Sequence, residues 1–219
     1  MLHGIDVSFC QTRPPPFDDP RVGFAYIRAT TGPRRDKLAA WHVSRMRPTG
    51  KPFGLYAFYE PDHSALEHFE AFDQFAAELR FESQEQPLVP AVDVEYYKGH
   101  GVGPSWEPGL RDFCDRLTEA YRAPPMLYMT AATWLLLGKP AWVSNCRHWV
   151  PWYPVEGHAL NLSSPRPSKV PCGASWDVWQ YGAAPLGGQV QRQYASTSLD
   201  LDWASSLYLV GGGVLSSPV

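Results

Sequence analysis

Short runs of β-branched and aromatic residues alternate with amphipathic segments along most of the chain, and this alternation constrains the fold more than any other feature. Strands separated by helices pair in parallel, because a parallel neighbour needs a crossover connection. Several runs are apolar on both faces, which is typical of strands buried between two layers. The runs that we predict to be strands cover residues 4–8, 24–30, 53–59, 88–95, 126–130, 148–153, 178–181 and a last one near 198–202.

Four segments between these strands are predicted to be helical. The clearest begins after Ser64, which forms a capping-box pattern with Glu67. Weaker helices are expected over 36–47 and 131–137. The apolar stripe expected for the helix after Ser64 is Leu66, Phe69, Phe72, Ala76 and Leu79. The face expected for a further helix, between Pro108 and Pro124, is Leu110, Phe113, Cys114, Leu117 and Tyr121.

The helical patterns become short beyond Thr130, and residues 154–175 are rich in Pro, Ser and Gly, which indicates a loop. The sequence shows neither an internal repeat nor a dividing linker. We therefore predict an α/β fold, a single irregular (β/α) TIM-like barrel with reduced helices in the C-terminal half. The barrel is expected over residues 1–210, with a flexible tail over 211–219.

Composition and spacing exclude several classes of protein. A net charge of −3 with 19 Lys and Arg does not favour nucleic acid or an anionic membrane as the partner. No apolar run approaches the roughly 20 residues of a membrane span, and the start lacks the pattern of a secretory signal. The 4 cysteines and 7 histidines lack metal-ligand spacing. We expect free buried thiols in preference to disulfides, solvated or capping histidines, no metal and no cofactor.

Acidic residues stand at the ends of three predicted strands. Asp6 ends the first, Asp93 and Glu95 end the fourth, and Asp200 and Asp202 lie on the last. In a parallel barrel the chemistry lies where the strands end, so a barrel would bring these carboxylates together.

Asp93 and Glu95 face the same side of their strand, with Cβ atoms about 6.5 Å apart at roughly 3.3 Å rise per residue. Val92 and Val94 suit contact with helices, so the two acids are expected to face the barrel interior. One carboxylate in such a place can stay protonated, as a general acid requires. A structural role stays open, with Asp93 capping a loop and Glu95 paired with an arginine.

Aromatic side chains accompany these acids at the neighbouring strand ends. Their flat apolar faces would suit sugar rings beside acidic groups, although about half could be ordinary core. The candidates are Tyr56, Phe58, Tyr128, Trp149, Trp152, Tyr153, Trp179 and Tyr181. Together the acids and rings predict a glycan site.

Taken in order, the strand segments resemble the family 25 glycoside hydrolases, the lysozymes (N-acetylmuramidases) of bacteria, fungi and phage lysins. The sequence departs from the family pattern at four positions. Cys10 stands where the family commonly has Trp, Ala57 where it has His, Thr31 where it has Glu, and Pro151 where it has a small residue. The matching segments are Gly4-Ile5-Asp6-Val7-Ser8 with Gln11, Phe24-Ala25-Tyr26-Ile27-Arg28-Ala29-Thr30 with Gly32, Gly54-Leu55-Tyr56-Ala57-Phe58, Asp93-Val94-Glu95, Leu127-Tyr128-Met129-Thr130, Trp149-Val150-Pro151-Trp152-Tyr153, Trp179-Gln180-Tyr181 and Leu199-Asp200-Leu201-Asp202.

The resemblance implies cleavage of the β-1,4 bond between N-acetylmuramic acid and N-acetylglucosamine in peptidoglycan, with assistance from the substrate's acetamido group. It implies Glu95 as the general acid and Asp93 as the residue that orients or stabilises that group. Asp6 and Asp200 would complete an acidic ring. The substrate-binding residues implied are Tyr56, Phe58, Tyr128, Trp152, Tyr153, Trp179 and Gln180.

Three other functions stay open. A zinc amidase or peptidase would need a ligand set that the sequence does not supply. A non-catalytic glycan-binding protein would keep the groove without the chemistry. A chitinase-like enzyme would carry a longer acidic strand than residues 89–92 supply. For the lysozyme reading we expect a monomeric phage lysin, made in the cytoplasm without a signal peptide, that reaches the bacterial wall on host lysis or with the virion.

Overall fold

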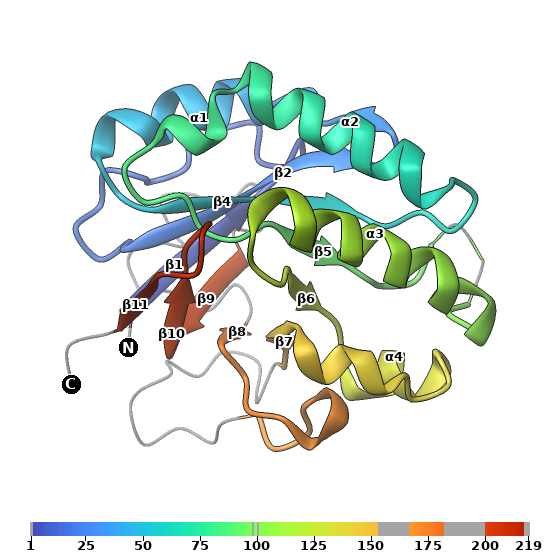
Figure 1. Ribbon diagram of the computed structural model, residues 1–219. Coiled ribbons are helices and arrows are strands. Elements are labelled where there is room, and N and C mark those ends of the chain that lie inside the picture. The colour runs from blue at the N-terminus through green and yellow to red at the C-terminus, as the bar shows by residue number, and fades with distance from the viewer. Residues whose placement is uncertain (1, 98, 100, 153–166, 182–199, 217–219) are drawn as a thin grey trace.

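The computed structural model describes residues 2–97, 99, 101–152, 167–181 and 200–216 (Figure 1). Eight of the described strands form a closed barrel in the order β1-β9-β8-β7-β6-β5-β4-β2, and β1 also pairs with β2. These barrel strands are β1 (Leu2–Val7), β2 (Phe24–Thr31), β4 (Phe53–Phe58), β5 (Ala91–Asp93), β6 (Met126–Tyr128), β7 (Arg147–Pro151), β8 (Val178–Gln180) and β9 (Asp200–Ala204). The predicted irregular barrel is therefore confirmed.

The barrel differs from the expected parallel arrangement at its last strand. β9 runs antiparallel to both β1 and β8, whereas the other barrel pairs are parallel. An apolar run predicts a strand but not its direction, since direction depends on the connection. A short strand, β3 (Arg34–Arg35), pairs antiparallel with the end of β2.

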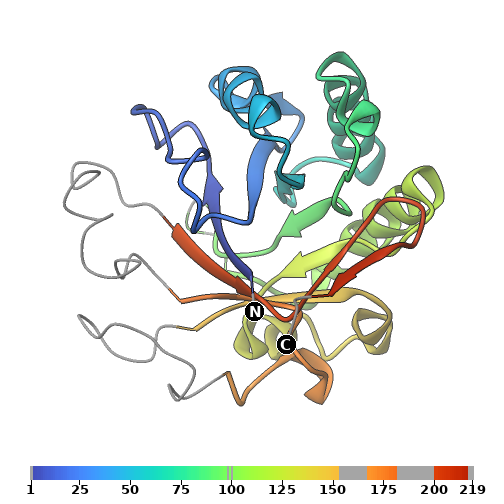
Figure 2. The same ribbon diagram turned by 90° about the vertical axis from the view of Figure 1, so that its left-hand side faces the viewer.

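Four helices and five short 3₁₀ turns connect the described strands. Figure 2 shows the helices on the outside of the barrel strands. The helices are α1 (Ala39–Met46), α2 (Ala65–Glu78), α3 (Glu107–Tyr121) and α4 (Ala131–Leu136). The 3₁₀ turns are η1 (Arg47–Thr49), η2 (Phe81–Ser83), η3 (Pro104–Trp106), η4 (Ala141–Asn145) and η5 (Pro171–Gly173).

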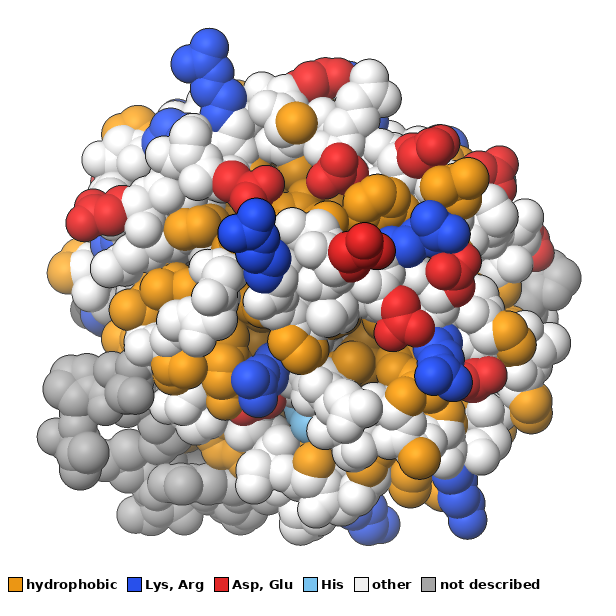
Figure 3. Space-filling view, viewed as in Figure 1, with side chains coloured by type: hydrophobic (Ala, Val, Ile, Leu, Met, Phe, Trp, Pro, Cys, Tyr) orange, Lys and Arg blue, Asp and Glu red, His pale blue; other side chains and the backbone are white. Residues whose placement is uncertain are grey.

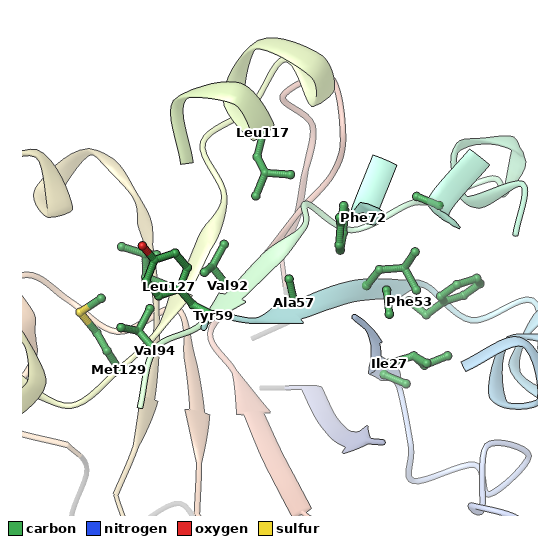
Figure 4. Close-up of a cluster of buried hydrophobic side chains, with 14 of the residues drawn as sticks. Ile27, Phe53, Ala57, Tyr59, Phe72, Val92, Val94, Leu117, Leu127 and Met129 are labelled. Carbon is green, nitrogen blue, oxygen red and sulfur yellow. The ribbon is translucent and has the colours of Figure 1, made fainter. Parts of the chain in front are cut away.

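The buried core has two parts, because successive residues of a strand point to opposite sides. Ala25 and Ile27 of β2 face outward into the cluster beneath the helices, where Leu117 of α3 and Phe72 of α2 also lie (Figure 4). Phe24 and Tyr26 face the barrel interior.

Two glycines make room for these interior rings. A Cβ atom at Gly54 would lie 2.2 Å from a ring carbon of Tyr26, and one at Gly4 would lie 2.3 Å from Phe24. Such distances are far inside van der Waals contact, so both strands need glycine where they flank β2.

The two long helices follow their sequence patterns unequally. All five residues expected on the inner face of α3 are buried. The capping box of Ser64 and Glu67 is present at α2, but the predicted stripe is wrong at Leu66, which is 45% exposed. His68 is fully buried instead. Its ring stacks on that of Tyr59, with the centroids 4.9 Å apart, and its Nε2 lies 2.9 Å from the carbonyl oxygen of Glu60.

Other expectations also change. His42 and His148 are buried like His68, so the expectation of solvated histidines is wrong for three of them; a backbone carbonyl satisfies one ring nitrogen of His42. All four cysteines are free thiols, as expected, but only Cys114 and Cys146 are buried, whereas Cys10 is exposed. Part of the tail expected to be flexible pairs as β11 (Val214–Ser216) with β10 (Ser206–Tyr208). Most of the predicted 154–175 loop lies outside the described residues.

Candidate active site

A pocket of about 220 Å³ opens where the parallel strands of the barrel end. β1, β5, β6 and β8 contribute their last residues or the one before, and antiparallel β9 contributes its first. The lining residues are Asp6, Ser8, Cys10, Gln11, Arg28, Tyr56, Asp93, Glu95, Tyr128, Trp149, Gln180 and Asp200. The barrel therefore brings together the four acids that the family resemblance implies for the site, Asp6, Asp93, Glu95 and Asp200.

The four acids differ in depth. Asp6 and Asp93 are buried, Asp200 is half-buried, and Glu95 is exposed at the pocket mouth. Asp6 and Asp200 face each other across the β1–β9 pair. Val92 and Val94 pack outward beneath the helices, as Figure 4 shows, so Asp93 and Glu95 face the interior as the alternation predicts.

Burial and mutual repulsion favour the protonated forms of these carboxyls. Burial raises the pKa of Asp6 well above its ordinary value, and the carboxyls of Asp200 and Asp202 add to the rise. Burial and then Glu95 raise the pKa of Asp93, which Arg28 opposes. Burial and then Glu95 raise the pKa of Asp200 to about 6.

The pKa of Glu95 is also raised, although this residue is more exposed than the other three acids. Partial removal of its carboxyl from water raises the Glu95 pKa, and the positive charge of Arg28 opposes this rise. Because four carboxyls share one pocket, they cannot all ionise without cost near neutral pH. The site can therefore hold a proton ready for transfer.

A chain of hydrogen bonds fixes the deepest of these acids. The Tyr128 hydroxyl donates to Oε1 of Gln180 at 2.7 Å, and Nε2 of Gln180 donates to Oδ2 of Asp6 at 2.7 Å. Since Gln180 accepts with one end and donates with the other, its amide orientation is set. Gln180 therefore positions Asp6 besides lining the pocket.

The sequence patterns do not single out Arg28, whereas Asp202 and Trp149 are among the acids and aromatic rings expected at the strand ends. Arg28 lines the pocket from β2, where the two-residue alternation with Phe24 and Tyr26 indicates an inward side chain. Asp202 is fully buried behind the pocket and accepts a 2.8 Å hydrogen bond from Nε1 of Trp149. The Asp-x-Asp spacing of β9 was the signal for Asp202.

The aromatic candidates divide. Tyr56 and Tyr128 line the pocket. Phe58 lies outside the pocket lining and packs against Tyr97, with the two ring centroids 6.2 Å apart. Trp179 is fully buried and contributes no surface. Trp152 is half-buried and packs 5.6 Å from Trp179, and Tyr153 lies outside the described residues.

The described part of the chain contains no group of three or more His, Cys, Asp or Glu arranged to hold a metal ion. Among the helices that the structure describes, none has the length and apolar character to cross a membrane. On the face formed by α1, α2 and α3, acidic and basic side chains are interspersed (Figure 3).

Comparison with known proteins places these features in a family. The family model for the glycosyl hydrolases of family 25 matches residues 5–186. Curated protein sequences gave no match. A bacterial lysozyme from Streptomyces coelicolor is similar in structure, with a TM-score of 0.70 at 22% identity over 93% of this chain and 91% of that chain.

Two further solved structures cover different sources. A family 25 lysozyme from Aspergillus fumigatus gives a TM-score of 0.71 at 18% identity, over 100% of this chain and 95% of that chain. The catalytic domain of endolysin ply40, from bacteriophage P40 of Listeria monocytogenes, gives 0.64 at 21% identity over 94% and 93%. At these identities the likeness shows a shared fold.

Proposed function

The chain belongs to family 25 of the glycosyl hydrolases, and from this premise we propose that it is a muramidase. It would cleave the β-1,4 bond between N-acetylmuramic acid and N-acetylglucosamine in peptidoglycan, with residues 1–210 as the catalytic barrel. The observation that carries this proposal is the gathering of Asp6, Asp93, Glu95 and Asp200 around one pocket.

In this proposal Glu95 is the proton donor. It lies at the mouth of the pocket, where a glycosidic oxygen can reach it, and its raised pKa keeps a proton available. As the bond from the anomeric carbon to the leaving oxygen breaks, the proton of Glu95 moves to that oxygen. Water later adds to the anomeric carbon and returns a proton to Glu95.

Asp93 would act on the substrate's acetamido group. Its carboxyl lies deeper than Glu95 on the same side of the chain, and its Oδ1 has no hydrogen-bond partner among the described residues. That oxygen can accept the acetamido N–H, which aligns the carbonyl oxygen for attack on the anomeric carbon. This substrate-assisted route needs no second nucleophilic carboxylate.

Tyr56, Tyr128 and Gln180 would contact the sugar, since all three line the pocket. Phe58, Trp152 and Tyr153 stay in the proposal only as candidates for more distant parts of the groove, and Trp179, which is fully buried, would support Trp152 from behind. The proposed partner is a glycan strand of the bacterial wall.

The direct test is Glu95→Gln, which keeps the shape of the side chain and removes the proton. Loss of a general acid typically costs about 10²- to 10⁴-fold in rate. We expect a loss of that size in the release of soluble fragments from purified walls, while Glu85→Gln, an exposed change elsewhere, leaves the rate unchanged. Undiminished lysis by Glu95→Gln would exclude Glu95 as the acid.

The rival functions give different results. A chelator that abolished lysis would favour a metal-dependent amidase, and wild-type protein that bound walls without releasing fragments would favour a non-catalytic glycan-binding role. Faster cleavage of chitin than of walls would favour a chitinase-like enzyme.

We further propose that the protein acts as a monomeric phage lysin, released at host lysis or carried by the virion. The shared fold with a phage endolysin catalytic domain supports this source. Lysis on addition to cells from outside, and a single-chain mass by light scattering, would test these two points.

A further inference from the structure

Among the twelve described residues that line the pocket, Arg28 is the one Lys or Arg, and four of the others are carboxylic acids. It comes from β2 and points inward with Phe24 and Tyr26. Its side chain is 12% exposed, so it forms part of the wall and is not a mobile surface group. A fixed cation among acidic side chains suggests a role in binding or catalysis.

Two groups hold the guanidinium in place. Its Nε donates to Oδ2 of Asp36 at 2.9 Å, and the ring of Phe9 lies 4.6 Å from its Cζ. Asp36 is itself fixed, because it also accepts the backbone N–H of Phe9 and of Leu38, each at 2.9 Å. This support orients Arg28 before any substrate arrives, which lowers the entropic cost of binding.

The guanidinium keeps unused donors. Arginine carries five N–H donors, and Asp36 takes only the one on Nε. Nη2 has no hydrogen-bond partner among the residues that the structure describes. A partly buried cation with unpaired donors is costly, so an oxygen acceptor in the pocket would stabilise it.

The proposed substrate offers such an acceptor on one of its two sugars. N-acetylmuramic acid differs from N-acetylglucosamine by a lactyl ether, whose terminal group is a carboxylate in stem-free strands and an amide where a peptide stem is attached. Both forms present an oxygen to a guanidinium, while the surrounding acids would repel the carboxylate form unless a cation faced it.

Resting on the proposed muramidase function, we propose that Arg28, positioned by Asp36 and Phe9, binds the terminal oxygen of the lactyl group and so selects muramic acid over glucosamine. A different role would be purely electrostatic, with Arg28 lowering the pKa of Asp93 and Glu95. That role would change the rate on every glycan and would not separate lactyl-bearing from lactyl-free sugars.

The test compares the binding of product-sized sugars by calorimetry in wild type, Arg28→Met and Arg28→Lys. The probes are the disaccharide of N-acetylglucosamine and N-acetylmuramic acid, the same disaccharide amidated with L-alanine, and chitobiose. Arg28→Met is expected to weaken binding of either lactyl disaccharide about 10- to 100-fold, as for loss of a charge-assisted hydrogen bond, and of chitobiose less than about 2-fold. The affinity of Arg28→Lys for the lactyl disaccharides is expected to lie between those of wild type and Arg28→Met, because lysine keeps the charge but lacks the planar guanidinium.

Arg35→Met is the matched control. Arg35 also bonds a carboxylate, that of Glu78, and lies 4.8 Å from an aromatic ring, but it is outside the pocket. It should leave all three affinities unchanged, and circular dichroism should show each variant folded.

Equal losses for chitobiose and the lactyl disaccharides would overturn the assignment, as would unchanged or unmeasurable binding of the lactyl disaccharides in wild type and variant alike. Wall digestion by the wild type is scored separately. A wild type that cleaves walls while Arg28→Met discriminates as before refutes only the role of Arg28, whereas a wild type that cleaves no wall refutes the muramidase function itself.

Discussion

Asp200→Asn should make the protein more stable at neutral pH, although it removes a residue of the proposed site. Asp200 is half-buried on β9, and burial followed by the nearby Glu95 raises its pKa from the ordinary 3.8 to about 6. Between pH 4 and 6 the folded state therefore binds more protons than the unfolded chain, so stability falls as pH rises through this window.

The size of the effect follows from that interval. The pKa of Asp200 rises from 3.8 in the unfolded chain to about 6 in the folded state. Each pKa unit corresponds to about 1.36 kcal/mol, so the ionised carboxylate destabilises the folded state by at most about 3 kcal/mol at pH 7.5. Partial exposure screens the charge, so we expect a gain of about 1–3 kcal/mol for Asp200→Asn at pH 7.5. At pH 4 the gain should shrink to about 0.5 kcal/mol.

The assay is urea unfolding followed by tryptophan fluorescence at pH 4, 5.5 and 7.5 and constant ionic strength. Asp62→Asn, an exposed position with the same change of charge, should stay within about 0.5 kcal/mol of wild type throughout. The reasoning is refuted if Asp200→Asn is less stable than wild type at pH 7.5, or if its effect is the same at pH 4.

Three further changes test the packing by urea unfolding. Leu117→Ala removes a fully buried side chain of α3 and should lower the free energy of unfolding by about 2–5 kcal/mol. A loss below about 1 kcal/mol would mean that α3 does not cover the barrel as described. Ser64→Ala removes the side chain that caps α2 and should cost about 1 kcal/mol, with no change contradicting the capping box. Gly54→Ala places a Cβ 2.2 Å from the ring of Tyr26 and should cost more than about 2 kcal/mol, so wild-type stability would show that the ring is free to move.

The sequence predicts the elements well where local patterns decide them. Strand positions and the buried face of α3 follow from periodicity, and the facing of Asp93 and Glu95 follows from the two-residue alternation of a strand. Tertiary packing overrides the pattern in α2, where the buried face includes His68 in place of Leu66. The antiparallel direction of β9 was not predictable, since it depends on pairing across the barrel and leaves no mark on an apolar run.

The candidate site shows the same division. The acids could be found because carboxylates at strand ends are conspicuous, whereas an aromatic residue gives no sign of whether it faces pocket or core. Trp179 is fully buried, and Tyr128 lines the pocket. Arg28 was overlooked because its significance lies in the acids around it, which only the closed barrel brings near.

The measurement that tests the central claim most directly is digestion of purified peptidoglycan, with mass spectrometry of the new reducing ends after reduction by borohydride. A muramidase that uses the acids of this pocket leaves N-acetylmuramic acid at every new reducing end, and Glu95→Gln leaves none above background. Reducing ends of N-acetylglucosamine, or fragments released with intact glycan strands and cut peptide stems, would contradict the proposed reaction.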